Sequence, residues 1–431
     1  MNARSVSGRA TPPRSATVAR LPLSSRASAL GCVGVCGYLI GVALPVSPTF
    51  DLPLVFLVLL ATSAAIAGLK QPTLSRSLAV IPVLGFATAR VVSSLVTPDA
   101  RSFQFLTPLL PALLLFFVLS EWVDTRQHVA AICVSLTVAG LLLAATLLTA
   151  WWLSPNSDAD VLASVTPNPM LTVKNDITAV AVLAPLALAA ALVWPRRLVQ
   201  ATAAAFFVAM ITVIAIVRSR TALLTLIVAI VAFALLTFGR RSTRARSVLV
   251  MLAGIAVLAV AVDALGGFPF AHKVAADWQG SGRVALWAAA LAMFRDAPVL
   301  GHGPNTFVLH YRAYLDALQL PAWIHVDPRV TPWAHNLYLE LLAEQGIVGF
   351  LAFLALGVTG LWMVRRTILS PDRQLHYLGA GVGAAFIAFL TAAFFELSLI
   401  RAWVTIILFT LLGLLSALTR SAKGASTCAA S

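Results

Sequence analysis

The chain has 431 residues, 60% of them hydrophobic and 11% charged, with a mean hydropathy of +0.93. This composition excludes a water-soluble globular protein of that length and predicts an all-α integral membrane protein, because the apolar runs are far longer than the roughly 10 residues of a barrel strand. The formal net charge of +14 reflects membrane topology and an attraction to anionic membrane lipids, so no nucleic-acid partner is predicted.

Twelve apolar segments are long enough to span a membrane as helices. They lie near residues 27–46, 52–69, 77–96, 104–121, 128–152, 177–195, 198–217, 221–238, 247–265, 346–364, 375–395 and 402–418. Because Lys and Arg resist translocation, a cytoplasmic N-terminus is favoured, which leaves 19 of the 30 basic residues on the cytoplasmic side. Both termini are therefore predicted to be cytoplasmic.

These spans divide the chain into five predicted parts. They are a basic cytoplasmic segment over 1–26, transmembrane helices one to nine over 27–265, one large outer loop over 266–345, helices ten to twelve over 346–418, and a cytoplasmic tail over 419–431. The large outer loop is therefore the part most able to carry a site of its own.

Three arginines lie near the outer ends of predicted spans, although Lys and Arg are normally found on the cytoplasmic side. Arg218 and Arg220 lie in the outer turn "VRSRTALL", and Arg90 lies several residues below the outer surface in the third span. Two guanidinium groups on a short turn can bind phosphate oxygens, and charges at membrane depth usually have a function. Alternatively, Arg218 and Arg220 snorkel into the lipid headgroups, and Arg90 pairs with a carbonyl or with Asp99.

The outer loop predicts two short helices joined by a glycine-rich turn. "GRVALWAAALAMFRDAP" over 282–298 contains Arg283 and Arg295 and has an apolar face at helical spacing, so it either lies along the membrane interface or packs on the bundle. "VLGHGPNTF", with Gly301 and Gly303, is a turn that could bring backbone close to a ligand, and "NTFVLHYRAYLDAL" predicts the second helix. The histidines of this loop have no metal-binding spacing, so no metal site is predicted.

His335 stands at the start of the helix that enters the tenth span. Asn336 can cap the first turn of that helix. Imidazole is the side chain that accepts a proton near neutral pH, which favours a general base here. The alternative is an interfacial histidine in an aromatic belt with Trp333 and Tyr338.

At this stretch the sequence resembles the O-antigen ligase family, which shares a superfamily with O-antigen polymerases and bacterial O-oligosaccharyltransferases. The family signature is a histidine, then Asn, Ser or Gln, nine residues, and Gly-x-x-Gly. Here it is matched by His335, Asn336, the nine residues 337–345, Gly346 and Gly349. The segment 281–307 is similar to the Arg, Trp, Pro-x-x-Gly-x-Gly part of the family pattern, and "RSRT" to its basic turn.

The resemblance implies an inverting, metal-independent glycosyltransferase of the bacterial inner membrane, with its active site facing the periplasm. Its donor would be a preassembled glycan on undecaprenyl pyrophosphate, and its acceptor a hydroxyl of the lipid A core of lipopolysaccharide. No cofactor is implied. His335 would be the base. The other implied site residues are Arg218 and Arg283 for the donor pyrophosphate, Arg220, Arg295 and Arg90 in support of them, and Asn336, Gly301, Gly303, Gly346 and Gly349 as supporting positions.

Three alternatives to the ligase stay open. A polymerase of the same superfamily would use a second lipid-linked glycan as acceptor, and an O-oligosaccharyltransferase would use a Ser or Thr of a protein. A membrane transporter is the third, because twelve spans with both ends inside is a common transporter layout and the three arginines could line an anion path. The sequence contains no corresponding pairs of interrupted spans in its two halves, which favours the enzyme.

Overall fold

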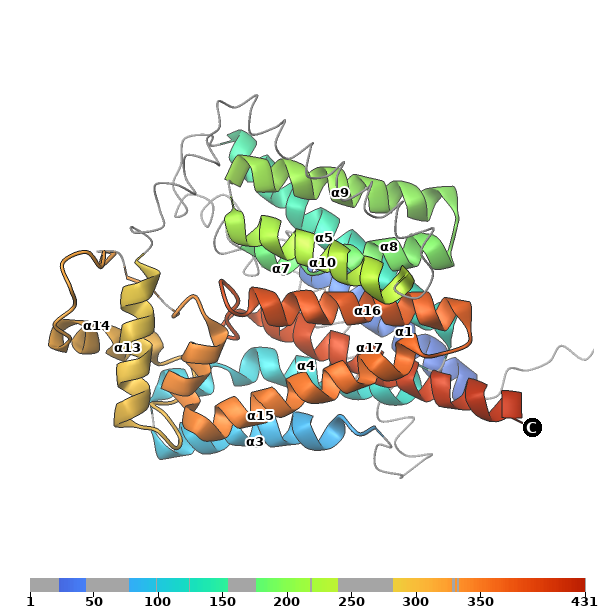
Figure 1. Cartoon of the computed structure of the whole chain (residues 1–431). Coiled ribbons are helices and arrows are strands. Elements are labelled where there is room, and N and C mark those ends of the chain that lie inside the picture. Colours follow the sequence, from blue (N-terminus) through green and yellow to red (C-terminus); the bar gives the residue numbers. More distant parts are fainter. Residues whose placement is uncertain are drawn as a thin grey trace, which may run out of the picture.

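The computed structural model describes four stretches of the chain. They are residues 23–43, 77–153, 176–238 and 282–430, apart from residues 98, 124, 218, 328, 329 and 332. Every regular element in these stretches is a helix, which confirms the all-α prediction for the described part. Most of the helices share one long direction and form a bundle (Figure 1).

The bundle and its end are built from the following elements. They are α1 (Leu23–Ala43), α3 (Val80–Val96), the 3-10 helix η1 (Ala100–Phe103), α4 (Leu106–Trp122), α5 (Arg126–Leu153), α7 (Ile177–Ala181), α8 (Ala184–Val193), α9 (Arg197–Val217), α10 (Arg220–Phe238), α13 (Arg283–Asp296), α14 (Phe307–Ala317), α15 (Leu337–Ile368), α16 (Arg373–Ala392) and α17 (Ala402–Ala430).

Seven helical stretches among the described residues are long and apolar enough to cross a membrane. They coincide with the spans predicted over α4, α5, α9, α10, α15, α16 and α17, and three shorter apolar stretches in α1, α3 and α7–α8 occupy further predicted spans. The predicted spans 52–69 and 247–265 lie outside the described residues, so the count of twelve stays a prediction. The chain is therefore a multi-pass helical membrane protein.

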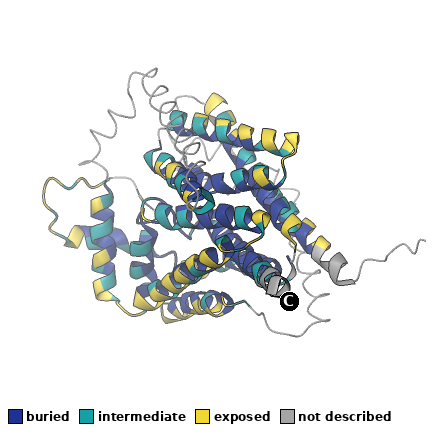
Figure 2. Ribbon diagram, turned by 45° about the vertical axis from the view of Figure 1, so that its right-hand side comes forward, coloured by how far each residue is buried: buried dark blue, intermediate teal, exposed yellow. Residues whose placement is uncertain are grey.

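The outer faces of the bundle are apolar, as helices in contact with lipid require. Ile81 of α3 and Leu198 of α9 are each 79% exposed, and Val358 of α15 is 60% exposed. Figure 2 shows exposed residues along the outward faces and buried residues within the bundle. Helix α17 lies at the centre, where 94% of its most apolar stretch is buried.

Contacts between distant residues define a basic end of the bundle. Arg126 at the start of α5 pairs with Asp372 before α16, and Arg420 of α17 donates to the carbonyls of Glu121 and Val123 at the end of α4. The described basic residues at this end are Arg126, Arg196, Arg197, Arg365, Arg366, Arg373 and Arg420 (Figure 1). Their segregation is the one that the predicted topology requires for the cytoplasmic side.

The opposite end carries α13 and α14, which confirms the two helices expected in the outer loop. Helix α13 lies across the direction of the bundle (Figure 1). It buries an alanine-rich face against α14 and α15 through Ala285, Ala289 and Met293, while Leu291 on the bulkier face is exposed. Of the two predicted placements for this helix, packing on the bundle is observed.

One helix boundary agrees with the prediction and one differs. Helix α15 begins at Leu337 directly after the cap at Asn336, as predicted, and it continues into the tenth span across a kink at Gly346, whose φ is 61°. The span predicted over 177–195 is split into α7 and α8. Pro185 lies at the start of α8 and has no N–H to donate backwards, which accounts for the break before it.

Candidate active site

His335 lies at the end of the bundle that carries α13, next to a buried carboxylate. Its Nδ1 atom is 3.2 Å from the carboxylate of Glu396, which is 1% exposed, whereas the His335 side chain is 19% exposed. Glu396 follows α16 in the turn that leads to α17. A histidine and a carboxylate far apart in sequence therefore meet where the imidazole still reaches solvent.

The contact with Glu396 decides which ring nitrogen of His335 can act. An ionised carboxylate accepts hydrogen bonds only, so Nδ1 carries the proton and donates it, which leaves Nε2 as the bare nitrogen. The indole Nε1 of Trp333 also lies 3.3 Å from Nδ1, and it too is a donor. The two contacts exclude each other as hydrogen bonds, and the charge-assisted bond to Glu396 is the stronger of the two.

Arg283 shares the Glu396 carboxylate with His335. Its terminal nitrogen donates to Oε2 of Glu396 at 3.0 Å, and its side chain is 28% exposed. Arg283 is the first residue of α13, so the free backbone donors of that helix lie beside it. The site thus combines an imidazole, a buried carboxylate next to it, and a guanidinium group.

Backbone contacts bring these side chains together. The N–H of Leu337 donates to the carbonyl of Ala393 at 2.8 Å, which joins the start of α15 to the turn after α16. The side chain of Asn336 accepts from the N–H groups of Tyr338 and Leu339, which confirms the predicted N-cap. His335 precedes this cap at a φ of 52°, a conformation that costs a non-glycine residue about 1–3 kcal/mol. Neighbouring contacts must therefore hold it.

The glycine-rich turn lies against α15. A Cβ on Gly301 would lie 2.3 Å from the backbone of Glu344, and one on Gly346 would lie 2.4 Å from the backbone of Val299. The N–H of Gly303 donates to the carbonyl of Glu344 at 2.7 Å, and that of Ile347 to the carbonyl of Pro298 at 2.8 Å. Gly301 and Gly346 are thus needed because two backbones touch there.

Glu344 completes this junction between α15 and α14. Its carboxylate accepts from the N–H groups of Asn305 and Phe307, at 2.8 and 2.9 Å, so it binds the start of α14. The hydroxyl of Ser93 of α3 donates to the carbonyl of Leu300 at 2.7 Å and lies 3.1 Å from the carbonyl of Glu344. Helix α14 and the turn before it are therefore attached to α15 and α3 of the bundle.

Comparison with known families identifies the segment that contains most of these residues. The sequence model described as O-antigen ligase matches residues 205–354. This segment belongs to the O-antigen ligase family. It includes His335, Asn336 and Arg283, whereas Glu396 lies beyond the matched range. No curated protein matches the chain significantly.

The arginines implied by the O-antigen ligase resemblance occupy different surroundings. Arg283 lies in the site, and Arg218 lies outside the described residues. Arg220 begins α10 at the same end of the bundle and is partly buried. Arg295 is exposed at the far end of α13, about 18 Å from Arg283 by helical rise. Arg90 is 4% exposed, and its guanidinium lies 4.7 Å from the ring centre of Phe105.

One loop histidine, His302, belongs to a separate hydrogen-bonded group with Asp296 of α13 and Tyr314 of α14. The hydroxyl of Tyr314 donates to Asp296 at 2.6 Å and lies 3.0 Å from Nε2 of His302. Burial, together with the bond to Asp296, raises the pKa of Tyr314 to about 12, so its hydroxyl stays protonated. Among the described residues, no three His, Cys, Asp or Glu side chains lie together as metal ligands.

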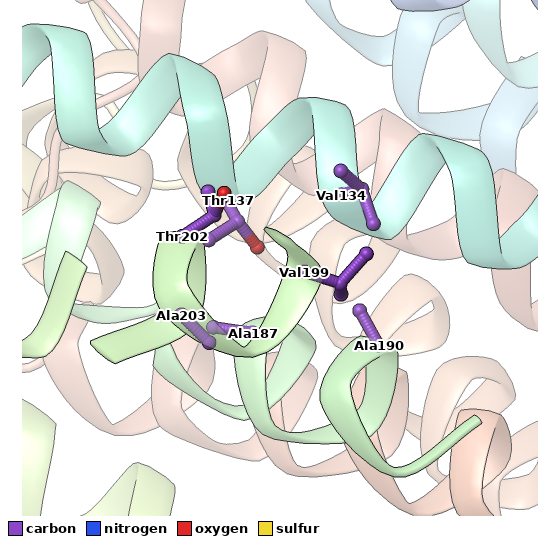
Figure 3. A pocket seen from close by; sticks show the side chains of 7 residues that line it. All are labelled: Val134, Thr137, Ala187, Ala190, Val199, Thr202 and Ala203. Carbon is purple, nitrogen blue, oxygen red and sulfur yellow. The ribbon is translucent and has the colours of Figure 1, made fainter. Parts of the chain in front are cut away.

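A shallow hollow elsewhere in the bundle has no part in this chemistry. It is lined by Val134, Thr137, Ala187, Ala190, Val199, Thr202 and Ala203 of α5, α8 and α9 (Figure 3). These side chains are small and none of them is ionisable, so the hollow reflects loose packing between three helices.

Sequence reasoning missed Glu396, Trp333 and Arg401 as members of the site. One signal for Glu396 was present: in "AAFFELSLIRAW" a single carboxylate lies between two predicted spans, at the outer boundary. Charges at that depth need a partner, so both Glu396 and Arg401 were candidates. The sequence alone does not show which partners they have.

Proposed function

We propose that this protein is an O-antigen ligase, which transfers a preassembled glycan from undecaprenyl pyrophosphate to a hydroxyl of the lipid A core at the periplasmic face of the bacterial inner membrane. The observation that supports this most directly is the contact of His335 and Arg283 with one buried carboxylate, Glu396, at one end of the helical bundle. Two of these three residues lie within the family segment.

His335 is the base of the proposed reaction. Because Nδ1 donates to Glu396, Nε2 takes the proton of the acceptor hydroxyl, and the negative carboxylate stabilises the imidazolium that forms. The hydroxyl oxygen then bonds to the anomeric carbon of the donor while the bond from that carbon to the pyrophosphate oxygen breaks. The pyrophosphate leaves with the bonding electrons, and the anomeric centre is inverted.

Arg283 is the first ligand of the proposed leaving group. A guanidinium group can bind two phosphate oxygens at once, and the start of α13 adds backbone donors next to it. Arg218 and Arg220 are proposed to contribute from the turn before α10. Fixed positive charge of this kind stabilises a departing pyrophosphate, so the proposal includes neither a general acid nor a metal ion.

The test is transfer by the purified protein in lipid vesicles, with lipid-linked glycan as donor. Three acceptors are compared, which are core lipid, a second lipid-linked glycan and a pilin-like protein. A ligase transfers to the core lipid; transfer only to the second glycan or only to the protein would replace the proposal by polymerase or protein O-oligosaccharyltransferase activity. Vectorial uptake of an anion without transfer would identify a transporter.

The role of His335 is tested by His335→Ala. We expect transfer to fall by about 100- to 10,000-fold while binding of the lipid-linked donor is kept, because the lost group acts on the acceptor. Donor binding and transfer are measured on the same preparation. Near wild-type transfer would show that His335 is only an interfacial residue, and parallel loss of donor binding would assign it to the phosphate.

A further inference from the structure

The indole ring of Trp333 packs beside the His335 ring. The two ring centres are 5.6 Å apart with an angle of 60° between the planes, and Trp333 is 7% exposed. The covalent bond to Cβ and the hydrogen bond from Nδ1 to Glu396 still allow the imidazole plane to tilt. The contact with Trp333 on the side of the ring limits this tilt and so helps to set the direction of Nε2.

Trp333 itself lies in a segment without regular structure before α15, so tertiary contacts must hold it. The guanidinium of Arg401 is 4.2 Å from the centre of its indole ring, a favourable cation–π distance. Arg401 comes from the start of α17. Three segments that are distant in sequence thus meet around one indole ring.

Arg401 is held in turn by Asp176, which directly precedes α7. Its terminal nitrogen lies 2.6 Å from Oδ1 of Asp176, and the two side chains are 7% and 3% exposed. Both charges are therefore paired away from solvent, where each needs the other. Arg401 is too deeply buried to contact a substrate at the site.

We propose that Arg401, held by Asp176, is a positioning residue for His335 that acts through Trp333. The inference rests on the proposed function, because it names the residues that hold the His335 ring in the orientation in which Nε2 can reach the acceptor hydroxyl. It extends the site to α7 and α17, and both Asp176 and Arg401 lie outside the family segment. The competing explanation is that the pair only stabilises the fold.

The kinetic test compares Arg401→Gln with Arg401→Lys. Gln removes the charge from Trp333 and Asp176, so we expect kcat to fall by about 10- to 100-fold with donor KM changed less than about 2-fold, as for a misplaced catalytic group. Lys keeps a charge for both partners, and we expect it to recover most of kcat. The matched control is Arg366→Gln, because Arg366 lies 4.8 Å from the Trp362 ring at the basic end.

The competing explanation predicts a different result. If the pair only stabilises the fold, the loss of transfer in Arg401→Gln follows the loss of folded protein, measured by size-exclusion chromatography and thermal unfolding. The folded fraction then has the wild-type kcat. That outcome, or an unchanged kcat in a fully folded variant, would overturn the proposal.

A double variant tests whether Arg401 acts through Trp333. Trp333→Leu alone is expected to lower kcat. Adding Arg401→Gln is then expected to lower kcat by less than about 2-fold more, because Arg401 affects His335 only through Trp333. Trp333→Phe, which keeps an aromatic ring without the N–H, is expected to retain more activity than Trp333→Leu. If the fold losses of kcat of the two single variants multiply in the double variant, Arg401 does not act through Trp333.

Nitrogen NMR separates this inference from the proposed function. In protein labelled with ¹⁵N-histidine, the signals of His335 are assigned by their loss in His335→Gln, and their shifts report which ring nitrogen carries the proton. We expect the Nδ1-protonated form in the wild type and a mixture of forms in Arg401→Gln. If the wild type transfers no glycan, the proposed function fails, yet this comparison still decides the inference: identical spectra would overturn it.

Discussion

Glu396 is the residue on which the proposed chemistry depends after His335. It is almost completely buried, and it accepts from His335 and Arg283 at 3.2 and 3.0 Å. One negative charge between two potential cations orients both side chains. In the proposed reaction it also faces the imidazolium that His335 becomes when it takes the acceptor proton.

We expect Glu396→Gln to lower kcat by about 100- to 10,000-fold, because an amide no longer requires the proton on Nδ1 and the wrong form of the ring is then populated. Transfer from the lipid-linked donor is the measurement. Asp372→Asn is the matched control, since Asp372 also pairs with an arginine and Asn keeps its N-cap. Comparable transfer by both variants would remove Glu396 from the mechanism.

At the scale of elements, the junction between α15 and the turn before α14 holds the outer helices in place. Gly346 has a φ of 61°, and its hydrogen atom faces the backbone of Val299 where a Cβ would lie at 2.4 Å. Any side chain there must push the two segments apart. The Gly-x-x-Gly part of the family signature therefore has a packing role at this residue.

Gly346→Ala is expected to destabilise the protein by about 1–3 kcal/mol, because the new methyl group meets backbone and the φ is unfavourable for alanine. The melting temperature in detergent reports this loss. Gly357→Ala on the same helix is the control, since its nearest contact is an ordinary 3.8 Å from the Leu390 side chain. Equal melting temperatures for the two variants would contradict the close approach.

For the whole molecule, the two ends of the bundle differ in chemistry. The basic end collects arginines at the helix termini, whereas the other end holds the paired charges Arg283–Glu396 and Arg401–Asp176. This division follows from the preference of Lys and Arg for the cytoplasmic side. On this rule, the site and α13 are predicted to face the periplasm.

A reporter enzyme that is active only in the periplasm tests this orientation. Fused at about residue 320, after α14, it is expected to be active, and fused after Arg246 it is expected to be inactive. Western blots of the two fusions control for their amounts. The reverse pattern would place the candidate site on the cytoplasmic side and overturn the proposed function with it.

By itself, the sequence determined the membrane class, the positions of seven spans and of three shorter apolar helices, the helices α13 and α14 and the cap at Asn336, and it supplied the candidate base. These features depend on local properties, namely apolar length, helical spacing and residue preferences at helix ends. Gly346 and Gly349 were recognisable as a motif, although their spacing did not reveal that Gly346 lies against another backbone.

Only the tertiary structure decided which distant side chains meet. Glu396 lies 61 residues from His335, and Arg283 lies 113 residues from Glu396, so no local pattern links them. In the same way Asp176, Arg401 and Trp333 come from three separate segments. A buried charge in a membrane protein needs a partner. Which residue becomes that partner depends on the packing of the helices, because these hydrogen bonds and ion pairs form only where the packed bundle brings the helix ends together.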